Sequence, residues 1–163
     1  MADMQQLLAT MPQIGKVQWM GIRPASLADI EVVDSLQIDL DQSIIGDHFK
    51  GRAGTKRQVT LIQQEHIATL KSILGIDVTP EMLRRNIVVS GINLMALKDR
   101  PFRIGSALLF GTGNCAPCSR MEKNLGPGGY NAMRGHGGLT ARVIESGTVS
   151  LGDSVVAESV TAE

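Results

Sequence analysis

The chain is dominated by short strand-like segments that do not alternate regularly with helices. Runs of apolar and β-branched residues, some with every second residue polar, are typical of strands that bury one face. Six segments fit this description, and the last two hold two to three strands between them: 16–23, 35–40, 58–63, 86–91, 102–111 and 139–156. Turns are expected at Gly147 and at Gly152–Asp153. We therefore predict a mainly β fold, a closed or partly closed, mixed or antiparallel β-barrel with short flanking helices.

Helical signals are few and short. Residues 2–10 precede Pro12, and in 64–74 apolar residues recur at spacings of three and four before Gly75. Thr79–Pro80–Glu81 supplies a capping hydroxyl, a proline at the first helical position and an acid in the first turn. The helix that starts there is expected to span about two turns, because strand-like sequence resumes near residue 86.

Two segments with several glycines are expected to be loops. Segment 46–57 is basic as well as glycine-containing, and segment 126–138 is so rich in glycine that it should not continue a helix. The second segment is either a lid over a pocket or a plain flexible connection. It lacks the G-K-[ST] ending of a phosphate-binding loop.

Length and charge narrow the class of protein. A chain of 163 residues is expected to form one domain, spanning residues 1–163. Lys plus Arg and Asp plus Glu number 16 each, and aromatic residues make up 3% of the chain, which argues against nucleic acid or an anionic membrane as partner. The first fifteen residues carry no Lys or Arg and no long apolar run, so we expect no signal peptide and a cytoplasmic location.

Both cysteines lie in GTGNCAPCSR (111–120), as Cys115 and Cys118. One interpretation is a redox dithiol, which needs the first cysteine at a helix N-terminus in a βαβ context. Here the pair follows a run of strands and precedes the glycine-rich segment, so that context is missing. A second interpretation is a single functional thiolate with cationic neighbours, which Arg120 and Arg134 can supply. A third is that both cysteines simply pack in the core.

A zinc site is the fourth interpretation of the pair. Structural zinc needs four nitrogen or sulfur ligands, and the chain has one C-x-x-C pair and three histidines, His48, His66 and His136. A Cys2His2 site could use His48 and His136, but no regular ligand spacing supports it. His66 lies in a predicted helix and would need its own explanation.

Read together, seven segments resemble the MOSC domain, a family named after the C-terminal domain of molybdenum cofactor sulfurases. The family also includes the mitochondrial amidoxime-reducing proteins and short stand-alone bacterial members. The resemblance covers about residues 14–157, and its most specific parts are the R-x-N-I segment, Cys118 and the closing G-x-V-x-x-G-D. In chain order the segments are GDH (46–48), RQVTLI (57–62), LRRNIVVSG (83–91), IG (104–105), PC (117–118), RGHGG (134–138) and GTVSLGD (147–153).

The resemblance implies a β-barrel with flanking helices and a set of site residues. The family cysteine that matches Cys118 is proposed to bind molybdenum or to carry sulfur, so Cys118 is the expected catalytic residue and metal ligand. In molybdenum-binding members the R-x-N segment contacts the pterin and its phosphate, which implies that role for Arg84 and Asn86. Cys115 does not match the family position.

Basic and polar residues near these segments are further candidates for cofactor binding. A terminal phosphate suits guanidinium groups, and a pterin edge suits an amide. The basic run of segment 46–57 either contacts the phosphate or is a solvated loop, and the G-D-H turn either lines the site or only caps a turn. The candidates are Arg57, Asp47, His48 and Arg134, with Lys50, Arg52 and Lys56 as the other members of the basic run.

Three functions follow from this resemblance. The first is a molybdenum-dependent oxidoreductase that binds the molybdenum cofactor (molybdopterin) and reduces small N-hydroxylated compounds. Electrons would come from a separate electron-donor protein, because the chain has no ferredoxin-like cysteine set and no dinucleotide fingerprint. The second is a sulfur carrier, in which Cys118 accepts a persulfide from a cysteine desulfurase, Cys115 acts as resolving thiol, and pyridoxal phosphate stays on that partner. The third is a cofactor-binding module without turnover.

Overall fold

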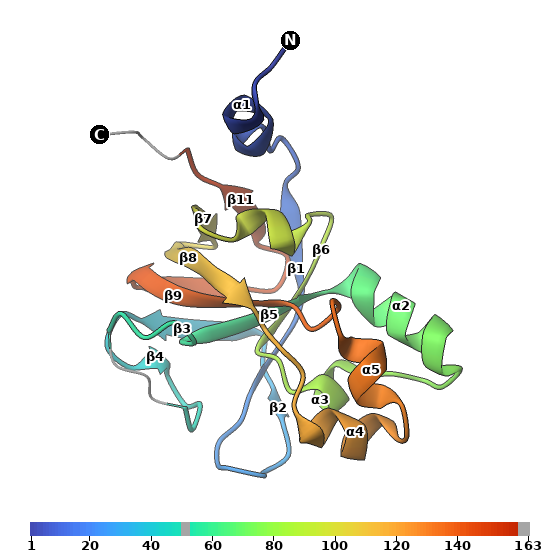
Figure 1. Ribbon diagram of the computed structural model, residues 1–163. Coiled ribbons are helices and arrows are strands. Elements are labelled where there is room, and N and C mark those ends of the chain that lie inside the picture. The colour runs from blue at the N-terminus through green and yellow to red at the C-terminus, as the bar shows by residue number, and fades with distance from the viewer. Residues whose placement is uncertain (50–52, 160–163) are drawn as a thin grey trace.

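The computed structural model describes residues 1–49 and 53–159, and a closed β-barrel forms its centre (Figure 1). The barrel strands are β1 (Gly15–Ile22), β5 (Val59–Gln63), β6 (Ile87–Ser90), β7 (Pro101–Ile104), β8 (Ala107–Asn114), β9 (Leu139–Glu145) and β11 (Ser154–Ala157). Around the barrel they follow the order β11-β7-β8-β9-β5-β6-β1, and antiparallel pairing of β1 with β11 closes the ring. The expected mainly β barrel is confirmed.

One pair of barrel strands makes the sheet mixed. β5 and β6 run parallel, whereas the other neighbouring barrel strands are antiparallel. Parallel neighbours need a crossover, and here the crossover contains α2 (Gln64–Leu74) and α3 (Pro80–Leu83). A second sheet lies beside the barrel and consists of β10 (Gly147–Ser150), β3 (Ser35–Asp39) and β4 (Ser43–Ile44). The short strand β2 (Glu31–Val32) pairs antiparallel with the end of β1.

The helices divide between two parts of the molecule. In Figure 1, α2 and α3 lie together with α4 (Ser119–Leu125) and α5 (Gly129–Met133) on one side of the barrel. α1 (Met4–Ala9) lies at the other end, near the last described residues of the chain, and the 3-10 turn η1 (Leu94–Leu97) follows β6. No helix in the described ranges is long and apolar enough to cross a membrane.

Two apolar clusters hold these parts together. One fills the barrel and includes Leu61 and Ile87 from the parallel pair. The other lies between the outer face of that pair and the helices, and it includes Ile62 and Val88. All five residues of β5 are buried, because one face meets the barrel interior and the other meets α2.

Most of the predicted boundaries hold. Helix 2–10 appears as α1, helix 64–74 appears as α2, and Gly75 ends α2 in the left-handed conformation with φ 67°. Segments 16–23, 35–40, 58–63 and 86–91 each contain a strand.

Four expectations about secondary structure are wrong in detail. Segments 102–111 and 139–156 hold five strands rather than two to three, because turns at 105–106 and 151–153 and a break at Ser146 divide them. Gly147 begins β10 instead of forming a turn. The helix starting at Pro80 is one turn long, since Arg84 takes a left-handed conformation with φ 58°. Segment 126–138 contains α5, which packs against α4 and α2 in spite of its glycines.

Candidate functional site

The two cysteines have opposite environments. Cys115 is buried, with 1% exposure, and its backbone N–H donates to the carbonyl of Gly138 at 2.8 Å. Cys118 is exposed and is the N-cap residue of α4, where its side chain makes no capping hydrogen bond. Both are free thiols. Because only Cys118 presents its sulfur to solvent, the geometry favours one functional thiol over a dithiol.

Arg85 fixes the backbone on both sides of this thiol. Its side chain is 4% exposed, and Nε donates to the carbonyl of Gly137 at 2.9 Å. The two terminal nitrogens donate to Leu83 at 3.0 Å and to Cys115 at 3.4 Å. One guanidinium therefore ties the end of α3 to the loop before Cys118 and to the loop after α5. Burial lowers the pKa of Arg85, and electrostatic interaction with Cys115, and to a smaller extent with Cys118, raises it.

The glycines of this region allow that close packing. A Cβ at Gly137 would collide with the carbonyl of Cys115, and one at Gly138 would collide with the carbonyl of Leu61. Gly138 also has φ 96°, which side chains rarely adopt. Gly137 and Gly138 therefore allow two backbone segments to lie in direct contact, and Gly138 also allows the chain to turn.

A second arginine approaches from β1 and is held by the G-D-H turn. Asp47 is 2% exposed and accepts from the Arg23 backbone N–H at 2.7 Å, from Nε at 3.2 Å and from NH2 at 3.0 Å. His48 bonds to the Arg23 carbonyl through its backbone N–H at 2.7 Å and through Nδ1 at 3.1 Å. Asp47 and His48 thus act together on Arg23, and their predicted contact with a cofactor stays a prediction.

Arg84 lies among other cations. Arg84 is half-buried, and its NH1 donates to the carbonyl of Ala28 at 2.8 Å. Burial lowers the pKa of Arg84, and the positive charges of Arg120 and Arg23 lower it further. Asp47 and Asp29 act against that shift. Such a gathering of guanidinium groups next to the cysteine-bearing helix is suited to a ligand with negative charge.

Asn86 is occupied by contacts inside the protein. Its side chain is 1% exposed, and Oδ1 accepts from the backbone N–H of Thr60 at 3.1 Å and from its hydroxyl at 3.0 Å. Nδ2 donates to the carbonyl of Gly21 at 3.5 Å. Asn86 precedes β6, and its side chain therefore links the start of β6 to β1 and β5. Its predicted contact with a pterin stays a prediction.

The remaining sequence candidates lie around this group. Arg57 is exposed just before β5 and is near enough to Arg85 to lower its pKa. Arg134 is exposed after α5 and lines a cavity of about 280 Å³ together with Cys115 and Pro117. Lys50 and Arg52 lie outside the described residues, and Lys56 is exposed.

The histidines do not join the cysteines. His66 and His136 meet edge to face with ring centroids 5.1 Å apart, which ties α2 to the segment after α5. Burial lowers the pKa of His66, the charge of His136 lowers it further, and Glu65 raises it. Across residues 1–49 and 53–159, no three His, Cys, Asp or Glu side chains are grouped to hold a metal ion. The structure therefore gives no support to a zinc site built from protein side chains.

Sequence reasoning missed two members of this site. Arg23 is the last residue of the predicted strand 16–23 and carried no local signal, since only the fold brings it to Asp47. Arg85 lies beside Arg84 in the R-x-N-I segment, where the left-handed backbone at Arg84 turns the two side chains to different neighbours. The available signal was the pair of adjacent arginines before Asn86.

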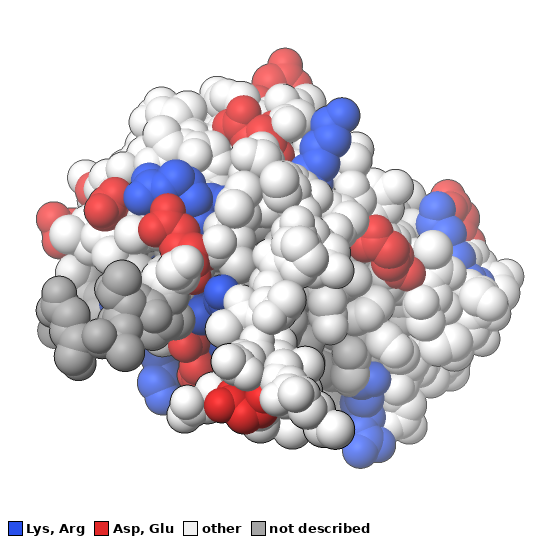
Figure 2. Space-filling model, turned by 90° about the horizontal axis from the view of Figure 1, so that it is seen from above, with Lys and Arg blue, Asp and Glu red and all other residues white. Residues whose placement is uncertain are grey.

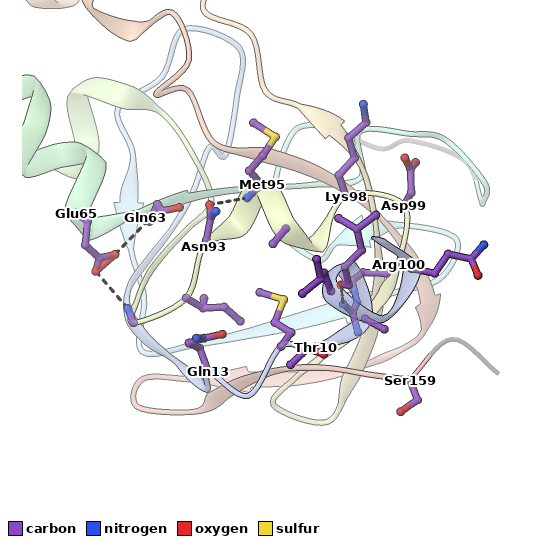
Figure 3. Close-up of a pocket in the computed structure, with 18 residues that line it drawn as sticks. Thr10, Gln13, Gln63, Glu65, Asn93, Met95, Lys98, Asp99, Arg100 and Ser159 are labelled. Atoms are coloured by element: carbon purple, nitrogen blue, oxygen red, sulfur yellow. Dashed lines mark hydrogen bonds between the residues drawn. The ribbon is translucent and has the colours of Figure 1, made fainter. Parts of the chain in front are cut away.

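A second, larger cavity lies elsewhere. It measures about 1240 Å³ and lies between α1, η1 and the loop before β7 (Figure 3). Its lining residues include Leu8, Ile92 and Arg100 but neither cysteine. Met95 lines both this cavity and the smaller one beside Cys115, so the two share a wall.

Comparisons with known proteins agree with this architecture. The MOSC domain pattern matches residues 44–156. The YuaD protein of Bacillus subtilis superposes with a TM-score of 0.79 at 21% identity, covering 93% of this chain and 100% of that one. YiiM of Geobacillus stearothermophilus gives a TM-score of 0.71 at 15% identity, with 88% and 75% covered. YiiM of Escherichia coli gives 0.67 at 19%, with 91% and 72% covered. A comparison with curated proteins finds no match.

Proposed function

The chain belongs to the MOSC domain family, and from that premise we propose that it binds the molybdenum cofactor and reduces small N-hydroxylated compounds. In this proposal Cys118 is the metal ligand. The observation that carries it is the placement of one exposed thiol at the edge of a group of arginines. Electrons come from a separate donor protein.

The residues present fit such a cofactor at both of its ends. Thiolate sulfur is a soft ligand, and the exposed Cys118 is free to provide it. The cofactor phosphate needs guanidinium donors, and Arg84, Arg120 and Arg23 lie together with few acids among them. Arg57 and Arg134 flank this group, and Asp47 and His48 position Arg23.

The proposed reaction is a two-electron removal of oxygen from nitrogen. Reduction of an N–OH group to N–H breaks the N–O bond, consumes two electrons and two protons, and releases the oxygen as water. The bound cofactor would supply the two-electron redox chemistry. The chain would bind the cofactor's charge, keep the Cys118 loop in place through Arg85, and orient the substrate beside it.

A sulfur carrier is the second candidate, and the exposure of Cys118 also supports it. An accessible thiol can accept a persulfide sulfur from a cysteine desulfurase that carries pyridoxal phosphate. The burial of Cys115 disfavours its predicted part as resolving thiol, because a 1% exposed side chain has to move before it reaches that sulfur. An external thiol acceptor would take its place.

Elemental analysis separates these functions. The protein is produced in a host that makes the molybdenum cofactor and is purified anaerobically, together with Cys118→Ser and the matched control Cys115→Ser. The proposal expects near-stoichiometric molybdenum in the wild type, its loss in Cys118→Ser and its retention in Cys115→Ser. Metal-free protein with cyanide-releasable sulfur on Cys118 would establish the carrier instead. Equal molybdenum loss in both variants would rule out Cys118 as the sole ligand.

A further inference from the structure

The cavity beneath α1 combines apolar walls with one unusual cation. Leu7, Leu8 and Met11 of the N-terminal segment line it from one side, and Ile92 and Met95 line it from the other. We call it the α1 cavity. At about 1240 Å³ it exceeds the usual range of small-molecule pockets, roughly 300–1,000 Å³. Apolar walls of this extent suit a ligand with a hydrocarbon chain.

The polar side chains at one side of the cavity are already engaged. The two Glu65 carboxylate oxygens accept from Gln63 at 3.4 Å and from the backbone N–H of Gly91 at 3.2 Å. The oxygen of the Gln63 amide accepts from the backbone N–H of Leu94 at 3.0 Å, and the Asn93 side-chain oxygen accepts from the backbone N–H of Met95 at 3.2 Å. In Figure 3 these residues lie on the side of the cavity away from Lys98, Asp99 and Arg100. A ligand's charged group would therefore find its donors on the Arg100 side.

Arg100 is a buried cation without a carboxylate partner. Arg100 is 8% exposed, and within the described part of the chain its side chain donates to the carbonyls of Leu8 at 3.1 Å and Glu158 at 3.2 Å. Among residues 1–49 and 53–159, no acid forms an ion pair with it, and its Nε is buried without a hydrogen-bond partner. A buried charge is costly unless an opposite charge compensates it. A carboxylate is the ligand group that matches a guanidinium.

The cover over Arg100 is weakly attached. α1 has no buried residue, and Leu7 and Leu8 are exposed despite lining the cavity. A side-chain hydrogen bond from Arg100 to the Leu8 carbonyl holds α1 at this point. A ligand that displaced α1 here would gain access to that terminal nitrogen and to the unbonded Nε. Figure 2 shows this end of the molecule, where uncharged residues cover much of the surface around the scattered charges.

From these observations we propose that the α1 cavity binds an amphiphilic carboxylate, with its hydrocarbon chain along the apolar walls and its carboxylate on Arg100. This site is separate from Cys118 and does not rest on the proposed function. The two are joined through Met95 alone, which lines both cavities.

Calorimetric titration with sodium decanoate below its micelle concentration tests the proposal, with decan-1-ol as the uncharged probe of the same chain length. Decanoate is expected to bind once per chain, and decanol at least about tenfold more weakly, because it lacks the charge-assisted bonds. Arg100→Met should weaken decanoate at least about tenfold. Arg103→Met is the matched control, since Arg103 lies in β7 three residues after Arg100, pairs with surface acids and does not line the cavity.

A second variant keeps the test decisive if Arg100→Met folds poorly. Leu8→Asp places a carboxylate at an exposed position of the cavity wall, and it should weaken decanoate while leaving the fold intact. Cys118→Ser should bind decanoate like the wild type. Equal affinity for decanoate and decanol, or no binding of decanoate to the wild type, would overturn the proposal whatever the molybdenum content.

Discussion

Two buried arginines, Arg85 and Arg100, differ in how fully their guanidinium groups are hydrogen-bonded. Each lies at a junction of loops, each donates to backbone carbonyls, and neither forms an ion pair within the described ranges. Arg85 uses all three of its nitrogens, whereas Arg100 leaves Nε unbonded. Arg85 joins three packed segments, and Arg100 joins the exposed helix α1 to the residue after β11.

The difference indicates which of the two regions is preformed. Around Cys118, Arg85 and the close glycine contacts hold the backbone in one arrangement before any cofactor binds. Around the α1 cavity, the cover rests on few contacts, and donor capacity remains unused. Preorganised groups suit a site that must orient a reaction, and a loosely covered cavity suits reversible uptake of a ligand.

The strongest test of this comparison is to remove each guanidinium in turn. Arg85→Met leaves three buried carbonyls without donors, and we expect it to lower the free energy of unfolding by about 3–5 kcal/mol. Arg100→Met removes donors only from the exposed Leu8 and the half-buried Glu158, and we expect a loss of about 2 kcal/mol. Urea denaturation of both variants measures the two effects. An equal or larger loss for Arg100→Met would contradict the conclusion that Arg85 stabilises its surroundings more than Arg100 does.

A smaller effect is expected for the acid that holds Arg23. Asp47→Asn removes the charge that accepts both side-chain bonds of Arg23 while keeping an oxygen for its backbone N–H, so stability should fall by about 2 kcal/mol. Asp29→Asn is the matched control, because exposed Asp29 affects Arg84 through its charge only. Thermal unfolding of the two variants should differ clearly. Equal melting temperatures would mean that Arg23 needs no buried partner.

The contact between His66 and His136 predicts that local stability depends on pH in the region of α2 and α5. The pKa of His66 in the folded protein lies below its ordinary value, so the unfolded chain binds more protons once the pH drops below about 6.5. Stability from this group is complete above that pH and declines as the pH falls through the folded pKa. After correction for the intrinsic pH dependence of amide exchange, the protection of α5 amides should therefore fall at pH 5, and that of α1 should stay unchanged. His66→Gln should remove the loss of protection in α5, and an undiminished loss would assign it to other groups.

The smallest effect on stability is expected at the cover of the cavity. Leu8→Ala shortens a largely exposed side chain, so the free energy of unfolding should change by less than about 0.5 kcal/mol. The same change removes part of the cavity wall, so decanoate should bind more weakly than to the wild type. Leu151→Ala, at an exposed leucine outside the cavity lining, serves as control. A large loss of stability in Leu8→Ala would show that α1 is firmly packed.

Much of the fold could be predicted because its signals are local. Leu36 and Ile38 alternate with polar residues, and both are buried on one face of β3. Gly75 and Pro80 mark a helix end and a helix start as predicted. The misjudged segment 126–138 shows the limit of such signals. Its glycines suggested a loop, but α5 forms because Ala132 and Met133 pack into the outer apolar cluster.

The sequence by itself determined the chemistry that is available: one C-x-x-C pair, a short run of arginines before Asn86, and a pattern of strands that resembles one family. Only the tertiary structure decided which groups can use that chemistry. Burial separates Cys115 from Cys118, and the barrel brings Arg23 from β1 to Arg84 and Arg85, across about sixty residues of chain. The reason is physical, since exposure and electrostatic proximity depend on distances between segments, which no local pattern encodes.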